Sequence, residues 1–405
     1  MEPKIRFKGF EGEGKETKYS SFATIRRGLT YSPENIVSKG IRVLRSSNID
    51  EDVFLRSEED VFVHSSCINI PFAKDGDILI TAANGSPRLV GKHAVINKLN
   101  GDKVVPGGFM ILASSKEPYF LNSCMGAPWY KTFLKTGVAG GNGAIGNLNK
   151  HALEEYEFYT PSNKLERDGL ASYFTSLDSQ ISASTSRLAS LKQMKAASLQ
   201  AMFPQEGETV PKIRFKGFEG EWKKVSFKDF TFHAGAKNRD NLPLESYSIS
   251  NEFGFIPQNE QFENGGTMTQ ADKRMYYIVS PNSFAYNPAR INVGSLGYYE
   301  GKEDVIVSSL YEVFKTDDTI CDKFLLYWFK TDIFQKMIEQ FQEGGVRLYF
   351  FYDKMCKCSL MRPSLAEQQA IASYFSSLDR QISLQSQRLE KLKQIKSACL
   401  DKMFV

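Results

Sequence analysis

The sequence predicts a mixed α+β protein in which two globular α/β bodies are each followed by a long helix, so that the whole chain is an internal repeat. A leader, PKIRFKGFEGE, occupies residues 3–13 and recurs unchanged at 211–221. An apolar ladder occupies residues 170–202 and recurs at 371–403, an offset of 201 residues. A period of about 200 residues is far too long for a solenoid. It indicates a tandem of two units, each made of a body and a helix.

The ladders have the 4-3 spacing that keeps one side of a helix apolar, which is typical of a coiled-coil seam. The predicted seam residues are Leu170, Phe174, Leu177, Ile181, Leu188, Leu191, Met202, Ile371, Phe375, Leu378, Ile382, Leu389, Leu392 and Met403. Both copies also carry a polar seam residue, Ser184 and Gln385, and a lysine near the end, Lys195 and Lys396. The polar residues either fix the helix register or face solvent at a local opening. The lysines either lie at the edge of the seam or contact a phosphate or a partner subunit.

The bulk composition is that of a globular protein with more than one core. The chain has 405 residues, of which 41% are hydrophobic and 24% are charged. A net charge of +4 permits nucleic-acid binding but does not argue for it. The six cysteines form no CxxC pair, which favours reduced thiols. Without a signal h-region or an apolar run of ~20 residues, we expect a cytoplasmic protein with no membrane partner.

The first body is predicted to contain short strands, one helix and a loose Gly-rich loop. Strands are predicted at 41–49, 76–81, 93–99 and 109–114, a helix at 118–135, the loop at 136–149, and a last strand before Pro161. The first long helix is predicted over 165–203. The polar, proline-bounded segment PQEGETVP that follows it is a linker.

The second body repeats this order of elements with a different sequence. Strands are predicted at 247–250, 276–280, within 284–299 and within 304–315, a helix at 324–341 and a Gly-rich loop at 343–355. Pro363 opens the second long helix. The resulting divisions are 1–162 for the first body, 163–203 for the central helix, 204–211 for the linker, 212–362 for the second body and 363–405 for the C-terminal helix.

Motifs for catalysis are missing or incomplete, so we expect no catalytic, cofactor-binding or metal-binding residues. GNGAIG at 141–146 matches G-x-G-x-x-G, but no buried strand precedes it. YNPAR at 286–290 resembles the N-P-P-aromatic motif of adenine methyltransferases but lacks the second proline and the aromatic residue. The four histidines are isolated from one another and from paired cysteines, which argues against a zinc site.

Taken together, the chain resembles the specificity subunit of type I restriction-modification enzymes. The leaders, the tandem of variable bodies and the helix openings PSNKLERDGLASYFTSLD and PSLAEQQAIASYFSSLD carry the resemblance, which covers essentially the whole chain. The second opening fits the family pattern better, because the first has one extra residue. GDILIT at 76–81 and VSSLYEVF at 307–314 also resemble strands of the family's target recognition domains.

The resemblance implies a division of labour between subunits. Each body would be a target recognition domain that reads one half of a bipartite, asymmetric double-stranded DNA site. The helices would pair as an antiparallel coiled coil that sets the spacer. Two modification subunits would dock beside them with S-adenosylmethionine and methylate adenine, and two restriction subunits would use ATP and Mg. This chain would be non-catalytic and hold none of these cofactors.

The geometry of duplex DNA is compatible with such a ruler. Two domains that read the same face of a duplex must sit about 34–36 Å apart, or one helical turn. A helix over residues 165–203 would be about 50 Å long. A duplicated chain also has the pseudo-twofold symmetry that matches the local dyad of DNA. A rigid spacer would make the gap length part of the specificity.

Residues for reading DNA are expected on loops that follow strands, where polar side chains can reach base edges. In the first body the candidates are Arg45, Ser46, Ser47, Asn48, Asn84, Ser86, Arg88 and Asn142. In the second body they are Asn287, Arg290, Asn292, Arg347 and Tyr349, with Lys237, Asn238 and Arg239 as a phosphate clamp. Two rival interpretations remain, a duplicated scaffold that binds proteins or glycans and a stand-alone enzyme whose site is made by the loops of one body.

Overall fold

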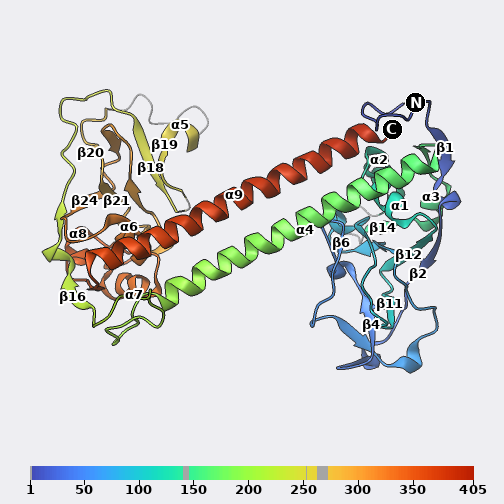
Figure 1. The fold of residues 1–405 in the computed structure, drawn as a ribbon, viewed down its shortest axis with the longest axis horizontal. Coiled ribbons are helices and arrows are strands. Elements are labelled where there is room, and N and C mark those ends of the chain that lie inside the picture. The colour runs from blue at the N-terminus through green and yellow to red at the C-terminus, as the bar shows by residue number, and fades with distance from the viewer. Residues whose placement is uncertain (1, 140–145, 252, 262–271) are drawn as a thin grey trace. The chain divides into compact units, whose positions relative to one another are not determined.

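The computed structural model describes residues 2–139, 146–251, 253–261 and 272–405 (Figure 1). The chain divides into two compact units, each of which contains one body and parts of both long helices. Unit 1 consists of Met1–Arg187 and Gln385–Val405, and unit 2 consists of Leu188–Leu384. None of the described helices is both long enough and apolar enough to cross a membrane.

The body of unit 1 is built on two four-stranded sheets. In the first, which is antiparallel, the order is β10 (His93–Val95), β8 (Ile78–Thr81), β12 (Met110–Ser115) and β2 (Ala23–Arg27). In the second, the order is β11 (Val104–Pro106), β4 (Ile41–Leu44), β7 (Val61–Val63) and β3 (Ile36–Val37), and β11 pairs with β4 in parallel. All four residues of β8 are buried, because both faces of this strand are covered.

Smaller elements complete this body. The remaining strands are β1 (Lys15–Lys18) with β15 (Glu157–Thr160), β5 (Ile49–Asp50) with β6 (Val53–Phe54), and the group β13 (Val138–Ala139), β14 (Gly146–Leu148) and β9 (Ala83–Asn84). The helices are α1 (Pro118–Met125), α2 (Pro128–Gly137) and α3 (Lys150–Glu155). The pairing of β1 with β15 joins the two ends of the body.

The body of unit 2 follows the same plan. Its antiparallel sheet has the order β17 (Thr231–His233), β24 (Glu312–Thr316), β21 (Ser283–Tyr286) and β22 (Leu296–Tyr299). Its second sheet has the order β19 (Gly254–Pro257), β18 (Ser246–Ser250), β23 (Val305–Val307) and β20 (Tyr277–Val279), and β18 pairs with β23 in parallel. Strand β16 (Lys223–Ser226) pairs with β25 (Ser359–Arg362), and the helices are α5 (Gln258–Gln261), α6 (Asp322–Trp328), α7 (Asp332–Phe341) and α8 (Tyr352–Met355).

The two helices predicted inside the bodies were each wrong in one respect, because each is broken into two. The segment 118–135 breaks before Pro128, whose ring disfavours a helical residue at Ala127. At this break a Cβ on Gly126 would lie 2.9 Å from the Leu400 side chain, so glycine allows a close approach to the C-terminal helix. The segment 324–341 breaks after Trp328, and the extended residue Thr331 precedes the start of α7.

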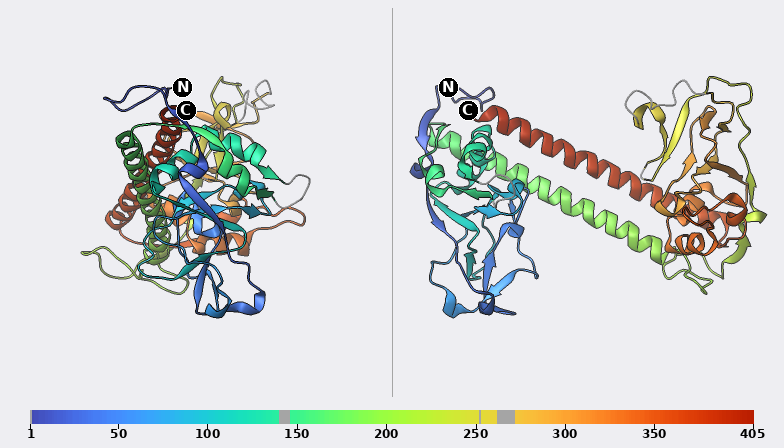
Figure 2. Two further views of the ribbon diagram at one scale, coloured as in Figure 1. Left: turned by 90° about the vertical axis from the view of Figure 1, so that its right-hand side faces the viewer. Right: turned by 180° about the vertical axis from the view of Figure 1, so that it is seen from behind.

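The two long helices are confirmed as α4 (Lys164–Ala201) and α9 (Leu365–Met403), and they run antiparallel within each unit (Figure 2). In unit 1 the start of α4 and the end of α9 share one core, for example through Phe174 and Met403. In unit 2 the end of α4 meets the start of α9 through Met202 and Phe375. Most predicted seam residues are buried, and Leu188, Ile382 and Leu392 are half-buried.

The first leader ties the ends of the two helices together in unit 1. The Arg6 guanidinium donates to both carboxylate oxygens of Glu166 in the first turn of α4, at 2.6 and 2.8 Å. The backbone N–H of Ile5 donates to the carbonyl of Lys402 near the end of α9, at 2.9 Å. A helix end leaves such carbonyl groups without partners, and a carboxylate near a helix start is favoured by the helix dipole.

The second leader repeats the arrangement in unit 2. Arg214 donates to both oxygens of Glu367 at 2.7 Å, and the N–H of Ile213 donates to the carbonyl of Ala201 at 2.9 Å. Each copy therefore joins the start of the helix that follows its own body to the end of the other helix. This explains why the leaders are duplicated along with the helices.

Candidate nucleic-acid interface

Two of the predicted reading loops in the first body come together. The amide of Asn84, which ends β9, donates to the hydroxyl of Ser46 at 3.2 Å. Both residues and Arg45 line a cleft of about 510 Å³. Arg45 and Ser46 directly follow β4, whereas Asn84 follows β8, so the cleft lies where strands of the two sheets end. This volume is in the usual range for ligand sites.

Two aromatic residues of this cleft were missed by the sequence analysis. Tyr31 and Phe109 both line it, and Phe109 is 66% exposed. Phe109 follows Gly107 and Gly108 in the turn before β12, so it is not the strand residue that was predicted. A large aromatic side chain after two glycines is a recognisable sign of a presented side chain. Exposed aromatic rings are suited to stacking on bases or to contact with a thymine methyl group.

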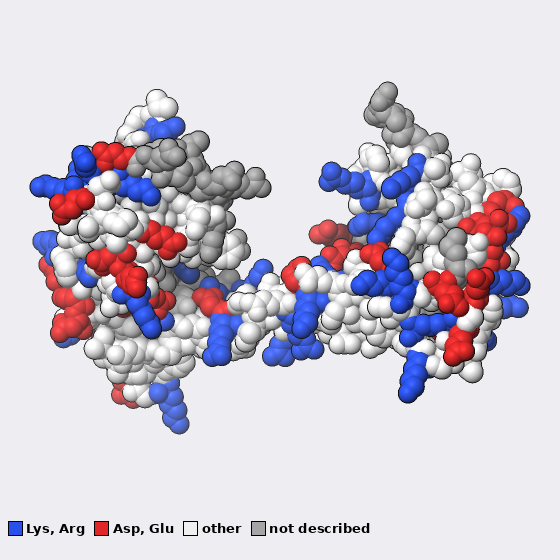
Figure 3. Space-filling view, turned by 90° about the horizontal axis from the view of Figure 1, so that it is seen from above, with Lys and Arg blue, Asp and Glu red and all other residues white. Residues whose placement is uncertain are grey.

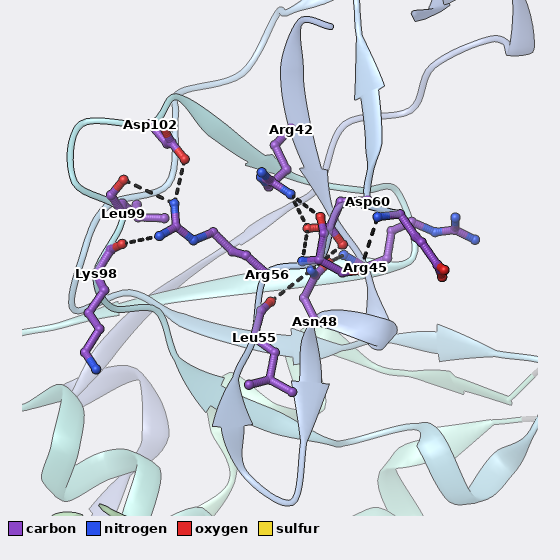
Figure 4. Close-up of polar contacts among 11 residues, drawn as sticks. Arg42, Arg45, Asn48, Leu55, Arg56, Asp60, Lys98, Leu99 and Asp102 are labelled. Carbon is purple, nitrogen blue, oxygen red and sulfur yellow. Dashed lines mark hydrogen bonds and ion pairs between the residues drawn. The ribbon is translucent and has the colours of Figure 1, made fainter. Parts of the chain in front are cut away.

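Three arginines surround the loop after β4, and two of them are already bonded within the body (Figure 4). Arg42 is ion-paired with Asp60. Arg56 lies 2.5 Å from a carboxylate oxygen of Asp102 and also donates to nearby carbonyls. Arg45 is exposed, and no hydrogen bond from its guanidinium is found among the described residues. Arg45 is therefore the arginine of this loop that is available to a ligand.

Asn48 was predicted to read DNA, and the structure contradicts this. Its side chain is 1% exposed. Its oxygen accepts from the N–H of Arg45 at 2.7 Å, and its amide donates to the Leu55 carbonyl at 3.0 Å and to Asp60 at 2.8 Å. Both the oxygen and the amide of the Asn48 side chain are therefore bonded within the body. Asn48 stabilises the loop that presents Arg45.

The other candidates of the first body do not join the cleft as one group. Ser47 and Ser86 are exposed, and the backbone N–H of Ser86 donates to Asn84 at 2.9 Å. Arg88 is exposed too, but it lines a different cleft beside Lys396. Asn142 lies outside the described residues.

In the second body two predicted loops also lie together. The loop after β21 carries Asn287, Arg290 and Asn292, of which the last two are exposed. The carbonyl of Pro288 in this loop accepts from the N–H of Phe350 at 3.0 Å, which places the loop of Arg347 and Tyr349 beside it.

The side chains of the second loop are presented in an ordered way. Tyr349 stacks on Phe351 with ring centroids 5.4 Å apart and an interplanar angle of 2°. The hairpin is closed by a bridge between Glu343 and Tyr349. Arg347 lies at the exposed tip beside Val346. The tip therefore offers one cation between exposed apolar side chains.

Of the three residues predicted to clamp a phosphate, Lys237 and Arg239 remain accessible, whereas Asn238 is buried. Asn238 is 1% exposed, and its side chain exchanges two hydrogen bonds with the backbone of Leu242 at 2.9 and 3.0 Å. Its predicted contact with DNA is therefore wrong, because the side chain closes a turn. Lys237 lies over the Tyr277 ring at 6.0 Å, and Arg239 is exposed.

The polar and basic seam residues make contacts across the helix pair. The Gln385 amide donates to the Ser184 hydroxyl at 2.6 Å and to its carbonyl at 3.2 Å, so these residues match the register alternative. Lys195 is paired with Asp379 and does not extend freely into solvent. Lys396 has two carboxylate partners. Burial alone would lower the pKa of Lys396, but these carboxylates outweigh burial and raise it above its ordinary value.

Within the described residues, no group of three or more His, Cys, Asp or Glu side chains is arranged to hold a metal ion. All six cysteines are free thiols. The arrangement in each body is instead one of presented arginine, amide and aromatic side chains at the ends of strands. This is the chemistry of a surface that reads base edges and phosphates.

The fold and these loops define a class of protein, a duplicated recognition scaffold on paired helices. Residues 220–394 match the model of the type I restriction modification DNA specificity domain. This match covers most of the second body and most of α9, and it confirms the resemblance seen in the sequence. No curated protein matches the chain in sequence.

The chain is similar in fold to the solved structure of one S subunit. The S subunit of a type I restriction-modification system from M. genitalium is 12% identical, matches 100% of this chain and 99% of its own, and has a TM-score of 0.60. A chain from a structural study of complex assembly and conformational transition of the type I R-M system is 13% identical. The match covers 97% of this chain and 98% of that chain, with a TM-score of 0.49. The HsdS subunit from Thermoanaerobacter tengcongensis is 14% identical, with 96% of both chains covered and a TM-score of 0.43.

Proposed function

We propose that this chain is the DNA-recognition subunit of a type I restriction-modification complex and that each body reads one half of a bipartite site. The observation that carries the proposal is the repeated architecture, in which two bodies of one plan are tied by matching leaders to antiparallel helices, in a chain whose residues 220–394 match a DNA specificity domain. Two half-site readers carried by the same pair of helices would make the distance between half-sites part of the specificity.

The reading surfaces are the two pairs of loops at the strand ends. In the first body, Arg45 and Asn84 have the side chains that pair with guanine and adenine edges, and Phe109 lines the same cleft. In the second body, Arg290 and Arg347 take the corresponding part. Lys237 and Arg239 contact phosphate, which positions the body without reading sequence.

The long helices support the complex in two ways. On the face drawn in Figure 3, the paired helices carry mainly Lys and Arg, whereas both signs of charge are mixed over the bodies. The exposed basic residues of the helices include Arg187, Lys192, Arg380, Arg388 and Lys391. This surface suits an anionic partner. We assign the remaining helix surface to the docking of two modification subunits, which bring S-adenosylmethionine. Two restriction subunits, which bring ATP and Mg, complete the complex.

The chain itself acts without catalysis, in the cytoplasm. Its contribution is to place a methyltransferase and a translocating nuclease on one DNA sequence. The adenine to be methylated is read within each half-site.

The test is binding of the purified complex of this chain with its modification subunit to a duplex that carries both half-sites. Methylome sequencing of the host supplies the sequence. We expect tight binding to this duplex and a large loss when one or two base pairs are inserted between the half-sites. A duplex with the same insertion outside the site is the control. Binding that ignores the spacer would favour a duplicated protein- or glycan-binding scaffold, and turnover by the isolated chain would favour an enzyme.

A further inference from the structure

The paired helices carry the same ion pair twice. Lys396 Nζ lies 2.7 Å from Asp178 Oδ1 in unit 1, and Lys195 Nζ lies 2.5 Å from Asp379 Oδ1 in unit 2. The two lysines are 201 residues apart, and so are the two aspartates. The helices therefore present an equivalent cation and anion to each body.

In unit 1 the body reaches this pair with the turn of the β5–β6 hairpin. Glu51 and Asp52 form the turn, with φ of 44° and 66°. This left-handed backbone is typical of a tight two-residue turn. Asp52 Oδ2 lies 2.9 Å from Lys396 Nζ, and Glu51 Oε1 lies 2.7 Å from Lys393 Nζ. Both lysines belong to α9, so two adjacent carboxylates of the body bind two lysines of one helix.

The hairpin is rigidly rooted in the body. Ile49 and Phe54, which flank the turn, are 2% and 7% exposed and belong to a core cluster that contains residues of both sheets. Around the turn, the body and α9 line a cleft of about 400 Å³. The turn therefore connects the body to α9 across this cleft through its two ion pairs. Because the turn is anchored in the core, its contact with α9 is coupled to the orientation of the body.

In unit 2 the body reaches the equivalent pair in a different way. The hydroxyl of Tyr327 on α6 donates to Asp379 Oδ2 at 3.0 Å, and the Tyr327 ring packs on Phe375 with centroids 5.0 Å apart. Tyr327 is 5% exposed. The second body thus uses a neutral, buried donor on the anion, whereas the first uses a partly exposed carboxylate on the cation.

From this contrast we infer that Asp52 is a positioning residue, which through Lys396 fixes the orientation of the first recognition body on the helix pair and thereby sharpens the choice of spacer length. The inference rests on the proposed function. The ion pair of Asp52 with Lys396 is screened by salt because the Asp52 side chain is 33% exposed, whereas the neutral Tyr327 contact is not screened. Salt should therefore loosen the first body more than the second.

The experiment compares Asp52→Asn with Asp50→Asn in the complex with the modification subunit. Both changes remove one negative charge from the same hairpin, and Asp50 is exposed with no ion pair among the described residues. The dissociation constant is measured on the cognate duplex and on duplexes whose spacer is one base pair longer or shorter. For Asp52→Asn we expect the preference for the cognate spacer to fall about two- to fivefold, the range of a partly exposed ion pair. Asp50→Asn should keep the wild-type preference.

High salt should reduce the spacer preference of the wild type to that of Asp52→Asn and leave Asp52→Asn little changed. If the wild type discriminates spacers and Asp52→Asn discriminates equally well, the positioning role is wrong while the proposed function stands. If the wild type itself binds all spacers equally, the proposed function fails.

Discussion

Arg45 and Asn48 stand three residues apart on one loop, yet the structure gives them opposite roles. Asn48 is buried, and its amide donates hydrogen bonds to Leu55 and Asp60. The Arg45 guanidinium points away from these groups (Figure 4). Asn238 resembles Asn48 in closing a turn on its own backbone. Polar side chains on a loop are thus divided between those that build the loop and those that it presents.

This division predicts different effects for two alanine variants. Arg45→Ala should leave the melting temperature unchanged and weaken binding to the first half-site by about 1–3 kcal/mol, the range for an arginine that contacts a guanine. Asn48→Ala should lower the free energy of unfolding of unit 1 by about 1–3 kcal/mol, because it leaves buried partners unsatisfied. Thermal unfolding and titration with duplexes altered in one half-site measure both. Equal effects of the two variants on stability would contradict the assignment.

A half-buried tyrosine and a buried cysteine make the stability of unit 2 depend on alkaline pH. Burial raises the pKa of Tyr352 to about 12 and the pKa of Cys358 to about 12. In the unfolded chain these groups lose their protons near pH ~10 and ~8.5. The folded state holds the protons more tightly, so their contribution is complete below the unfolded pKa values and is lost as pH rises from about 9 to 12. Unfolding followed by circular dichroism should show this decline, and Tyr352→Phe with Cys358→Ala should make it shallower.

At the scale of elements, the leaders act as clamps. Arg6 and Glu166 are 160 residues apart in sequence, and the carboxylate is 2% exposed. The same clamp recurs with Arg214 and Glu367. Because each leader also bonds to the last turn of the other helix, it joins the start of one helix to the end of the other within its own unit. The two leaders are therefore structural parts, although they are rich in charged residues.

Breaking one clamp should be costly. Arg6→Met leaves the buried Glu166 without its bidentate partner, and removal of one partner from a buried ion pair typically costs about 3–5 kcal/mol. Because Arg6 itself is 17% exposed, we expect about 2 kcal/mol or more from chemical denaturation of unit 1. The matched control is Lys4→Met, at an exposed position of the same leader. A similar small loss in both variants would mean that the clamp contributes little.

At the scale of the whole molecule, each unit is completed by a helix segment from the other half of the sequence. Unit 1 contains the end of α9, and unit 2 contains the end of α4. The apolar side of α4 in unit 1, including Phe174, is covered by residues such as Met403 and Phe404 of the C-terminal segment. The halves of the chain are therefore not independent folding units, although each has its own sheets.

The internal repeat predicts how half a chain behaves. A fragment of residues 1–203 lacks α9, but its own α4 repeats the seam of α9. A second copy can therefore supply the missing helix, and we expect a symmetric dimer in light scattering. Phe174→Asp, which charges the buried seam, should abolish this dimer, whereas Lys192→Asp at an exposed position should not. A stable monomeric fragment would contradict the interpretation.

The sequence by itself determined the repeat, the two long helices, their seam and the family resemblance, because these follow from local periodicity and from identity between distant copies. The loops that carry Arg45, Asn84, Arg290 and Arg347 could also be predicted, since polar residues followed strand-like runs. Only the tertiary structure decided which of these side chains are presented. Asn48 is enclosed by residues that follow it in the loop and by Asp60, Asn84 meets Ser46 from another strand, and Arg6 finds Glu166 across a whole body. Burial and pairing depend on which distant segments pack together, and no local pattern records that choice.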